Sequence, residues 1–187
     1  MVKKKTCVFI SGSGTNLKAL ISNSRHYNFP ININLIIFNN KNANGLSFAK
    51  KFAIPYIVIN SKDKLFKKKI LKEIKKKNIS LICLAGYMKI ISKRFIKNFN
   101  GKIINIHPSL LPKFKGLNTF SRVLKKKEKK TGCTVHFVNE KLDSGKIILK
   151  KEFLIHKNDN VKSLKEKTKK LEYLAYSEAL IKILKTS

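Results

Sequence analysis

One stretch near the N-terminus, residues 6–21, has the sequence TCVFISGSGTNLKALI. Its first five residues form a short run of apolar and β-branched side chains, as in a strand that is buried on both faces. A glycine-rich turn follows, and the next residues place apolar side chains at helical spacing. A strand, a tight turn and a helix in this order predict the first unit of a parallel α/β sheet.

The turn between this strand and helix has the features of a phosphate-binding loop. Glycines let backbone N–H groups approach an anion, and a helix N-terminus carries about half a positive charge. Leu17 stands where a dinucleotide-binding pattern has its third glycine, and the loop lacks the Gly-Lys-Ser/Thr sequence of nucleotide triphosphatases. The sequence therefore predicts a site for a single phosphate, with a ligand-free tight turn as the alternative.

The remaining chain alternates expected strands with expected helices, and it shows no internal repeat or linker. We therefore expect one domain over residues 1–187, with a Rossmann-like, mostly parallel sheet, helices on both faces and a more antiparallel part near the end. Ser61 and Ser92 are the expected N-caps of two of the helices. The further strands are expected at 31–38, 56–59, 81–85, 102–107, 132–139 and 146–153, and the further helices at 44–52, 64–77, 93–99, 118–127 and 161–184.

Ligands of such sheets bind beyond the carboxyl ends of the strands, near the point where the strand order reverses. Four expected loops follow strands: Ser11–Asn16, Gly86–Met88, the segment after His107, and 140–145. We expect them to converge on one crevice.

The strand over 102–107 ends in a histidine just before Pro108, which forces the chain out of a regular helix or strand. Asn105 and His107 are two residues apart, so a strand points both to the same face. An amide beside an imidazole suits hydrogen bonding to a developing oxyanion together with proton transfer. The alternative is a strand end with a structural histidine.

The formal net charge is +32, which would normally indicate nucleic acid or an anionic membrane as a partner. Only Arg25, Arg94 and Arg122 are arginines, although phosphate and base recognition favour the arginine fork. Asparagine and isoleucine are abundant too. We interpret most of the charge as compositional drift in an A/T-rich genome and expect no specific nucleic-acid partner.

Cysteine usage and hydropathy indicate a cytoplasmic protein. Cys7, Cys83 and Cys133 are far apart, lie in apolar runs and lack metal-ligand spacing. We therefore expect buried thiols in a reducing compartment and no metal. No run is long enough for a signal peptide or a membrane span.

Taken together, four motifs resemble the phosphoribosylglycinamide formyltransferase family of folate-dependent formyltransferases. They fall in the family's order and span nearly the whole chain. The last two are shared with other folate-dependent formyl-transferring enzymes, whereas the first is similar to the family's ribonucleotide-phosphate loop. The motifs are 10–17, 84–88, 105–112 and 132–145, the last with Val135-His136-Phe137-Val138 and Leu142-Asp143-Ser144-Gly145.

The resemblance implies transfer of a formyl group from 10-formyltetrahydrofolate to the glycyl amine of glycinamide ribonucleotide in purine biosynthesis. It makes Asn105, His107 and Asp143 the catalytic trio. Asn105 and His107 would stabilise a tetrahedral intermediate, and Asp143 would orient and support the imidazole. His136 also fits the family pattern, with a structural histidine as the alternative. The formyl group comes with the folate, so no metal is implied.

The resemblance also assigns the substrate-binding groups. Gly14, Thr15 and Asn16 would hold the ribonucleotide phosphate, and Glu172, with Lys169 nearby, would lie close to its glycyl amine and ribose. For Glu172 and Lys169, an exposed face of the final helix is the alternative. The folate pocket would be lined by Met88, Lys89, Ile90, Ile91, Glu140, Lys141, Leu142 and Asp143.

Departures from the family pattern concern the folate side. Lys89 stands where the family usually has arginine, and Lys62 or Lys64 would substitute for an arginine that meets the folate tail. Asn118 and Phe120 replace family histidines.

The rival enzymes are a methionyl-tRNA formyltransferase, which needs a second domain for tRNA, and a formyltetrahydrofolate hydrolase. The rival outside enzymes is a basic nucleic-acid-binding domain. We expect a monomer or a weak homodimer.

Overall fold

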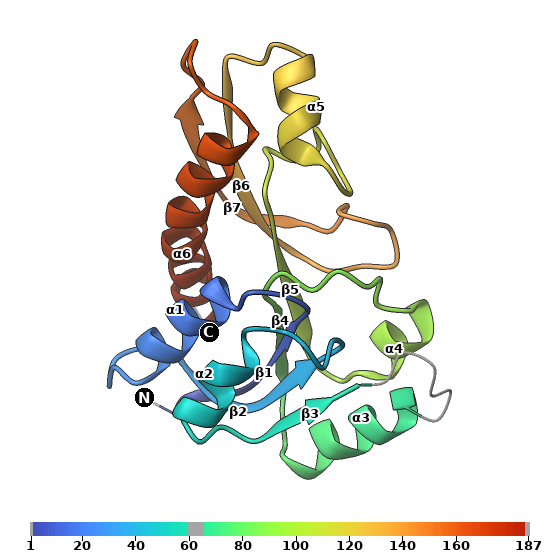
Figure 1. Cartoon of the computed structure of the whole chain (residues 1–187). Helices are drawn as coiled ribbons and strands as arrows, with labels where there is room; N and C mark the ends of the chain where they lie inside the picture. The colour runs from blue at the N-terminus through green and yellow to red at the C-terminus, as the bar shows by residue number, and fades with distance from the viewer. Residues whose placement is uncertain (1, 60–65, 186–187) are drawn as a thin grey trace. The chain divides into compact units, whose positions relative to one another are not determined.

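The structure is a computed structural model that describes residues 2–59 and 66–185 (Figure 1). The chain forms two compact units, Met1–Ile104 and Asn105–Ser187. The boundary falls inside strand β5 (Lys102–His107). The expectation of a single domain over 1–187 stays a prediction.

Seven strands form one mixed sheet in the order β3-β2-β1-β4-β5-β6-β7. Strand β1 (Lys4–Ile10) pairs in parallel with β2 (Ile31–Phe38) and with β4 (Leu81–Leu84), and β2 pairs in parallel with β3 (Tyr56–Val58). Strands β6 (Lys130–Phe137) and β7 (Ile147–Leu154) pair antiparallel. The predicted Rossmann-like sheet with an antiparallel end is thus confirmed.

The core of the first unit is formed by β1, β2 and β4, whose apolar runs are buried on both faces as the sequence predicts. The Phe9 ring contacts the Tyr87 and Phe95 rings edge-on, at centroid distances of 5.4 and 6.0 Å. Ser92 caps the helix of Phe95 as predicted, because its hydroxyl accepts the Phe95 N–H at 3.3 Å. The helices of this unit are α1 (Thr15–Ser24), α2 (Leu46–Lys51), α3 (Phe66–Lys76) and α4 (Lys93–Asn98).

The second unit contains helix α5 (Thr119–Lys125), strands β6 (Lys130–Phe137) and β7 (Ile147–Leu154), and helix α6 (Val161–Lys185). Helix α6 packs along β6 and β7. Ala175 is buried and Leu174 is exposed, which decides between the two core positions that the helical pattern left open. The other buried residues of α6 are Leu164, Thr168, Glu172, Tyr176, Ala179 and Leu180.

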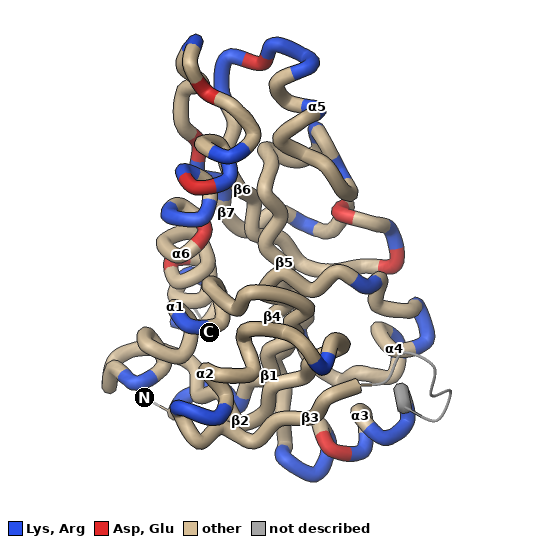
Figure 2. Tube along the Cα trace, viewed as in Figure 1, with Lys and Arg blue, Asp and Glu red and all other residues tan. Residues whose placement is uncertain are grey.

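Lysines and arginines mark α3, α6 and the segment after α5 (Figure 2). Lys68, Lys69 and Lys72 of α3 are exposed, which agrees with a solvated face. The predicted cap Ser61 lies outside the described residues. Cys7, Cys83 and Cys133 are buried free thiols, as predicted. Within the described ranges no helix is long and apolar enough to cross a membrane.

The pairing of β6 with β7 depends on Gly132. A Cβ atom at this position would collide with the Lys151 carbonyl and lie 2.8 Å from the Glu152 Cα. We expect Gly132→Ala to lower the free energy of unfolding by about 2 kcal/mol, because the strands must move apart. Urea unfolding followed by circular dichroism measures this loss. Gly12→Ala is the matched control, since no atom lies within 4 Å of a Cβ there. An equal loss in both variants would contradict the prediction.

Candidate active site

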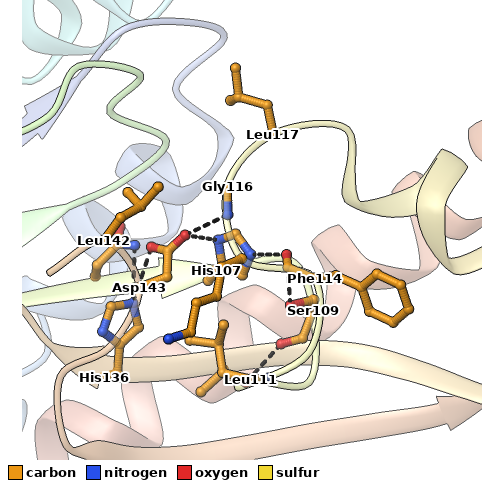
Figure 3. Close-up of polar contacts among 12 residues, drawn as sticks. His107, Ser109, Leu111, Phe114, Gly116, Leu117, His136, Leu142 and Asp143 are labelled. Atoms are coloured by element: carbon orange, nitrogen blue, oxygen red, sulfur yellow. Dashed lines mark hydrogen bonds and ion pairs between the residues drawn. The ribbon is translucent and has the colours of Figure 1, made fainter.

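His107 is the last residue of β5, and Pro108 turns the chain away directly after it. Its side chain is only 7% exposed, and both ring nitrogens face acceptors (Figure 3). Nδ1 lies 3.4 Å from Oδ2 of Asp143, and Nε2 lies 2.9 Å from the carbonyl oxygen of Phe114. A neutral imidazole carries one N–H, whereas an imidazolium donates from both nitrogens. Because a carbonyl oxygen can only accept, Nε2 of His107 donates to Phe114, and Nδ1 faces the Asp143 carboxylate.

Asp143 brings one buried carboxylate to two histidines. Its side chain is 8% exposed, and its backbone is left-handed, with φ 45°. Oδ2 accepts the Gly116 N–H at 2.8 Å, in addition to facing His107, and Oδ1 lies 3.8 Å from Nε2 of His136. The hydrogen bond from Gly116 fixes the direction of the carboxylate.

His136 on β6 orients the amide of Asn105. Nδ1 of His136 donates to the Phe137 carbonyl at 2.8 Å, so Nε2 of the neutral ring accepts from Nδ2 of Asn105 at 3.2 Å. Burial lowers the pKa of His136, and this keeps the ring neutral. One N–H of Asn105 is thereby bound, and the second can donate to a substrate oxygen.

The loop after His107 is fixed to β6 by buried hydroxyl groups. Thr134 accepts the Leu111 N–H at 3.1 Å and donates to the Ser109 carbonyl at 2.7 Å. Ser109 in turn donates to the Lys113 carbonyl at 2.8 Å. Ser109 and Thr134 are fully buried, so these bonds hold the segment that carries the Phe114 carbonyl.

In the first unit, the loops after β1 and β4 meet, as the switch point between these neighbouring strands predicts. The Ser11 hydroxyl accepts the Met88 N–H at 2.7 Å, and the Ser11 N–H donates to the Gly86 carbonyl at 3.2 Å. Gly14 begins helix α1 with φ 77°, and a Cβ on it would lie 2.7 Å from Gly45 Cα. This backbone requires glycine.

The phosphate-loop residues Gly14, Thr15 and Asn16 lie at the N-terminus of α1, a ten-residue helix, where backbone N–H groups suit a phosphate. Leu17 is fully buried, in agreement with a packing role at the position of the absent third glycine. We predict that this loop and the His107–Asp143 pair form one site. This stays a prediction, because the two groups belong to different units.

The predicted folate-pocket residues present apolar side chains to solvent. Met88 and Ile90 are 69% and 78% exposed in the first unit, and Leu142 is 54% exposed in the second. Exposed apolar side chains beside polar loops fit a flat, partly apolar ligand. Lys89, Glu140 and Lys141 are also exposed, and Ile91 is half-buried. Lys62 and Lys64 lie outside the described residues.

Glu172 is 8% exposed on the packed side of α6, so an exposed helix face is wrong for this residue. Burial, and next the Glu172 charge, raise the pKa of the Cys133 thiol to about 12, which places the carboxylate near β6. Lys169 is half-buried. Asn118 has a left-handed backbone before α5, and Phe120 is half-buried.

Several site groups escaped prediction from the sequence. The sequence did not predict the contacts of His136 with Asn105 and Asp143. It also did not predict that the Phe114 carbonyl and the Gly116 N–H take part in the site. The sequence already predicts that His136 faces inward, whereas its two partners and the backbone groups leave no signal in the sequence. Among the described residues, no cluster of His, Cys, Asp or Glu could hold a metal ion.

Comparison with known proteins places this site in a family. The family model described as formyl transferase matches residues 4–180. A curated relative from Haemophilus influenzae is 40% identical over 179 residues, covering 92% of this chain and 84% of its own length. A solved structure from Brucella melitensis is 36% identical, with a TM-score of 0.92 over 97% of this chain and 96% of its own.

The chain therefore belongs to the formyl transferase family. The Haemophilus relative and the Brucella structure are both named phosphoribosylglycinamide formyltransferase. The chain also matches trifunctional purine biosynthetic proteins, for example the human one at 40% identity, but it spans only 13 to 18% of their length.

The burial of His136 predicts a pH dependence of stability. Its pKa is lowered mainly by burial; the nearby charges of His107 and Lys115 lower it further, while Asp143 and the Phe137 carbonyl raise it. The unfolded chain takes up this proton at higher pH, near the usual value of 6.5. The free energy of unfolding should therefore fall as the pH drops below that value.

Urea titrations between pH 7.5 and 5 test this origin. His136→Gln should show a smaller loss of stability on acidification than the wild-type protein, because the buried titrating ring is gone. His26→Gln, at an exposed histidine, should retain the wild-type dependence. The same slope in His136→Gln and wild type would contradict the assignment.

Proposed function

We propose that this chain transfers the formyl group of 10-formyltetrahydrofolate to the glycyl amine of glycinamide ribonucleotide in purine biosynthesis. The observation that carries the proposal is the buried His107–Asp143 pair beside the Asn105 amide, in a member of the formyl transferase family. The relatives named phosphoribosylglycinamide formyltransferase, which match over most of their length, support this choice of acceptor.

Asn105, His107 and Asp143 perform the chemistry in this proposal. The substrate amine attacks the formyl carbon, so a C–N bond forms and the carbonyl oxygen gains negative charge. The second N–H of Asn105 donates to that oxygen, and Nε2–H of His107 joins it when this N–H leaves the Phe114 carbonyl for the substrate. The bond from carbon to the folate nitrogen then breaks, and a proton lost by the amine reaches that nitrogen with His107 as general acid. Asp143 keeps the ring oriented.

The remaining residues bind the two substrates. The backbone of Gly14, Thr15 and Asn16 holds the ribonucleotide phosphate at the start of α1. Glu172 and Lys169 approach its glycyl and ribose groups. Met88, Ile90 and Leu142 pack on the folate ring system. Lys89, Ile91, Glu140 and Lys141 complete this folate site.

The protein acts in the cytoplasm as a monomer or weak homodimer, and two small-molecule substrates are its partners. Buried free thiols at Cys7, Cys83 and Cys133 support a reducing compartment.

An assay with two acceptors tests the function. Purified protein with 10-formyltetrahydrofolate and glycinamide ribonucleotide should release tetrahydrofolate, followed by its absorbance change. Charged initiator tRNA, or water alone, should give no release above background. Turnover with tRNA or water but not with the ribonucleotide would overturn the proposal in favour of a methionyl-tRNA formyltransferase or a hydrolase.

His107→Ala tests the role of the imidazole. We expect kcat to fall roughly a hundredfold or more, because an oxyanion donor and the general acid are both lost. Ribonucleotide affinity, measured by calorimetry, should stay within a factor of about two, because phosphate binding rests on another loop. His156→Ala, at an exposed histidine, is the control. Lost affinity with unchanged kcat would contradict the role.

A further inference from the structure

Arg122 on α5 contacts the loop that supplies both backbone partners of the histidine–aspartate pair. One guanidinium nitrogen, Nη1, donates to the carbonyl oxygens of Lys115 at 2.6 Å and Leu117 at 3.0 Å. The guanidinium carbon also lies 5.6 Å from the centroid of the Phe114 ring. Arg122 thus contacts three residues of the loop 114–117.

The same four residues point their other backbone groups at the site. The Phe114 carbonyl accepts from Nε2 of His107, and the Gly116 N–H donates to Oδ2 of Asp143. Carbonyls of Lys115 and Leu117, which alternate with these groups, face Arg122. One side of the loop therefore binds the guanidinium, and the other side binds the imidazole and the carboxylate.

The loop conformation needs such support. Phe114 and Gly116 both have left-handed backbones, with φ values of 57° and 78°. Glycine adopts this conformation readily, but a phenylalanine does not. Phe114 must remain left-handed for its carbonyl to face His107, so a group that holds both its ring and the following carbonyls fixes that direction.

We propose that Arg122 is a positioning residue for the formyl transfer, acting on His107 and Asp143 through the loop 114–117. The inference rests on the roles given to these two residues under the proposed function. Planar Nη1 offers two N–H groups in a fixed fork, and the guanidinium carbon lies over the Phe114 ring in a cation–π contact. A lysine ammonium at this position could reach the carbonyls as a point charge but would lack the fork and the flat face.

Two variants of Arg122 separate positioning from simple stability. Arg122→Met retains a long, unbranched side chain but removes every hydrogen-bond donor. We expect kcat to fall about tenfold to a hundredfold, because the imidazole is misplaced. Arg122→Lys should recover part of that loss. KM for the ribonucleotide should stay within about twofold of the wild type in both, because the phosphate loop is in the other unit.

The imidazole itself supplies a readout that does not depend on turnover. In ¹⁵N-labelled protein, the Nε2 resonance of His107 reports its hydrogen bond to Phe114. This resonance should shift in Arg122→Met, and the acidic limb of the kcat profile should move with it. Thermal unfolding of each variant shows whether the fold persists.

Arg25→Met is the matched control. Arg25 stacks on Phe52, with its guanidinium carbon 4.6 Å from the ring centroid, in the first unit. It should retain wild-type kcat and the wild-type His107 resonance.

Each outcome of these experiments bears either on the inference or on the proposed function. Wild-type kcat and an unshifted resonance in Arg122→Met would overturn the inference. A fall in kcat that Arg25→Met matches would also overturn it. Inactive wild-type protein would sink the proposed function instead, and the His107 resonance would still decide whether Arg122 positions the ring.

Discussion

The carboxylate of Asp143 is the group on which the site geometry depends. A buried carboxylate must be paired or hydrogen-bonded, because desolvation of a bare charge costs far more than one contact returns. Here Oδ2 receives the Gly116 N–H and faces His107, while Oδ1 faces His136. Burial of this one charge therefore joins the turn after β6, which carries Asp143, to the end of β5, to the loop after β5 and to His136 within β6.

Two histidines share this carboxylate and yet have opposite tasks. His107 has an acceptor at each nitrogen, the Asp143 carboxylate at Nδ1 and the Phe114 carbonyl at Nε2. His136 has one acceptor, at Nδ1, and one donor, at Nε2, which suits only a neutral ring. Hydrogen bonding thus gives the two rings different partners within one cluster. The neutral ring of His136 fixes the amide of Asn105, which lies two residues before His107 on the same strand.

The fold could be predicted because buried parallel strands are continuous apolar runs. The bounds of β2 and β5 were predicted to the residue, whereas α2 is shorter at both ends than the predicted helix 44–52. Helix ends depend on capping, and Gly45 at the start of α2 provides no side-chain cap. The joint position of Asn105 and His107 followed from the two-residue period of a strand.

Other parts of the site could not be predicted from residue types. The role of Asp143 followed only from the family resemblance, since nothing local connects it to His107. The Phe114 carbonyl is a backbone group, and phenylalanine gives no hint of a left-handed conformation. The tautomer of His136 depends on the carbonyl of its neighbour Phe137, which is decided by the local backbone and not by the side-chain pattern.

The few arginines of this chain differ from its many lysines in the contacts that they make. Lysine and arginine together number 42, but only three are arginines, so a cation alone does not require arginine in this chain. Two of the three, Arg25 and Arg122, make cation–π contacts with phenylalanine rings, a contact for which a planar guanidinium is suited. Arg122 adds a fork to two carbonyls behind the imidazole. Most lysines lie on solvated faces. At position 122 the geometry of the contacts, and not the charge alone, accounts for an arginine.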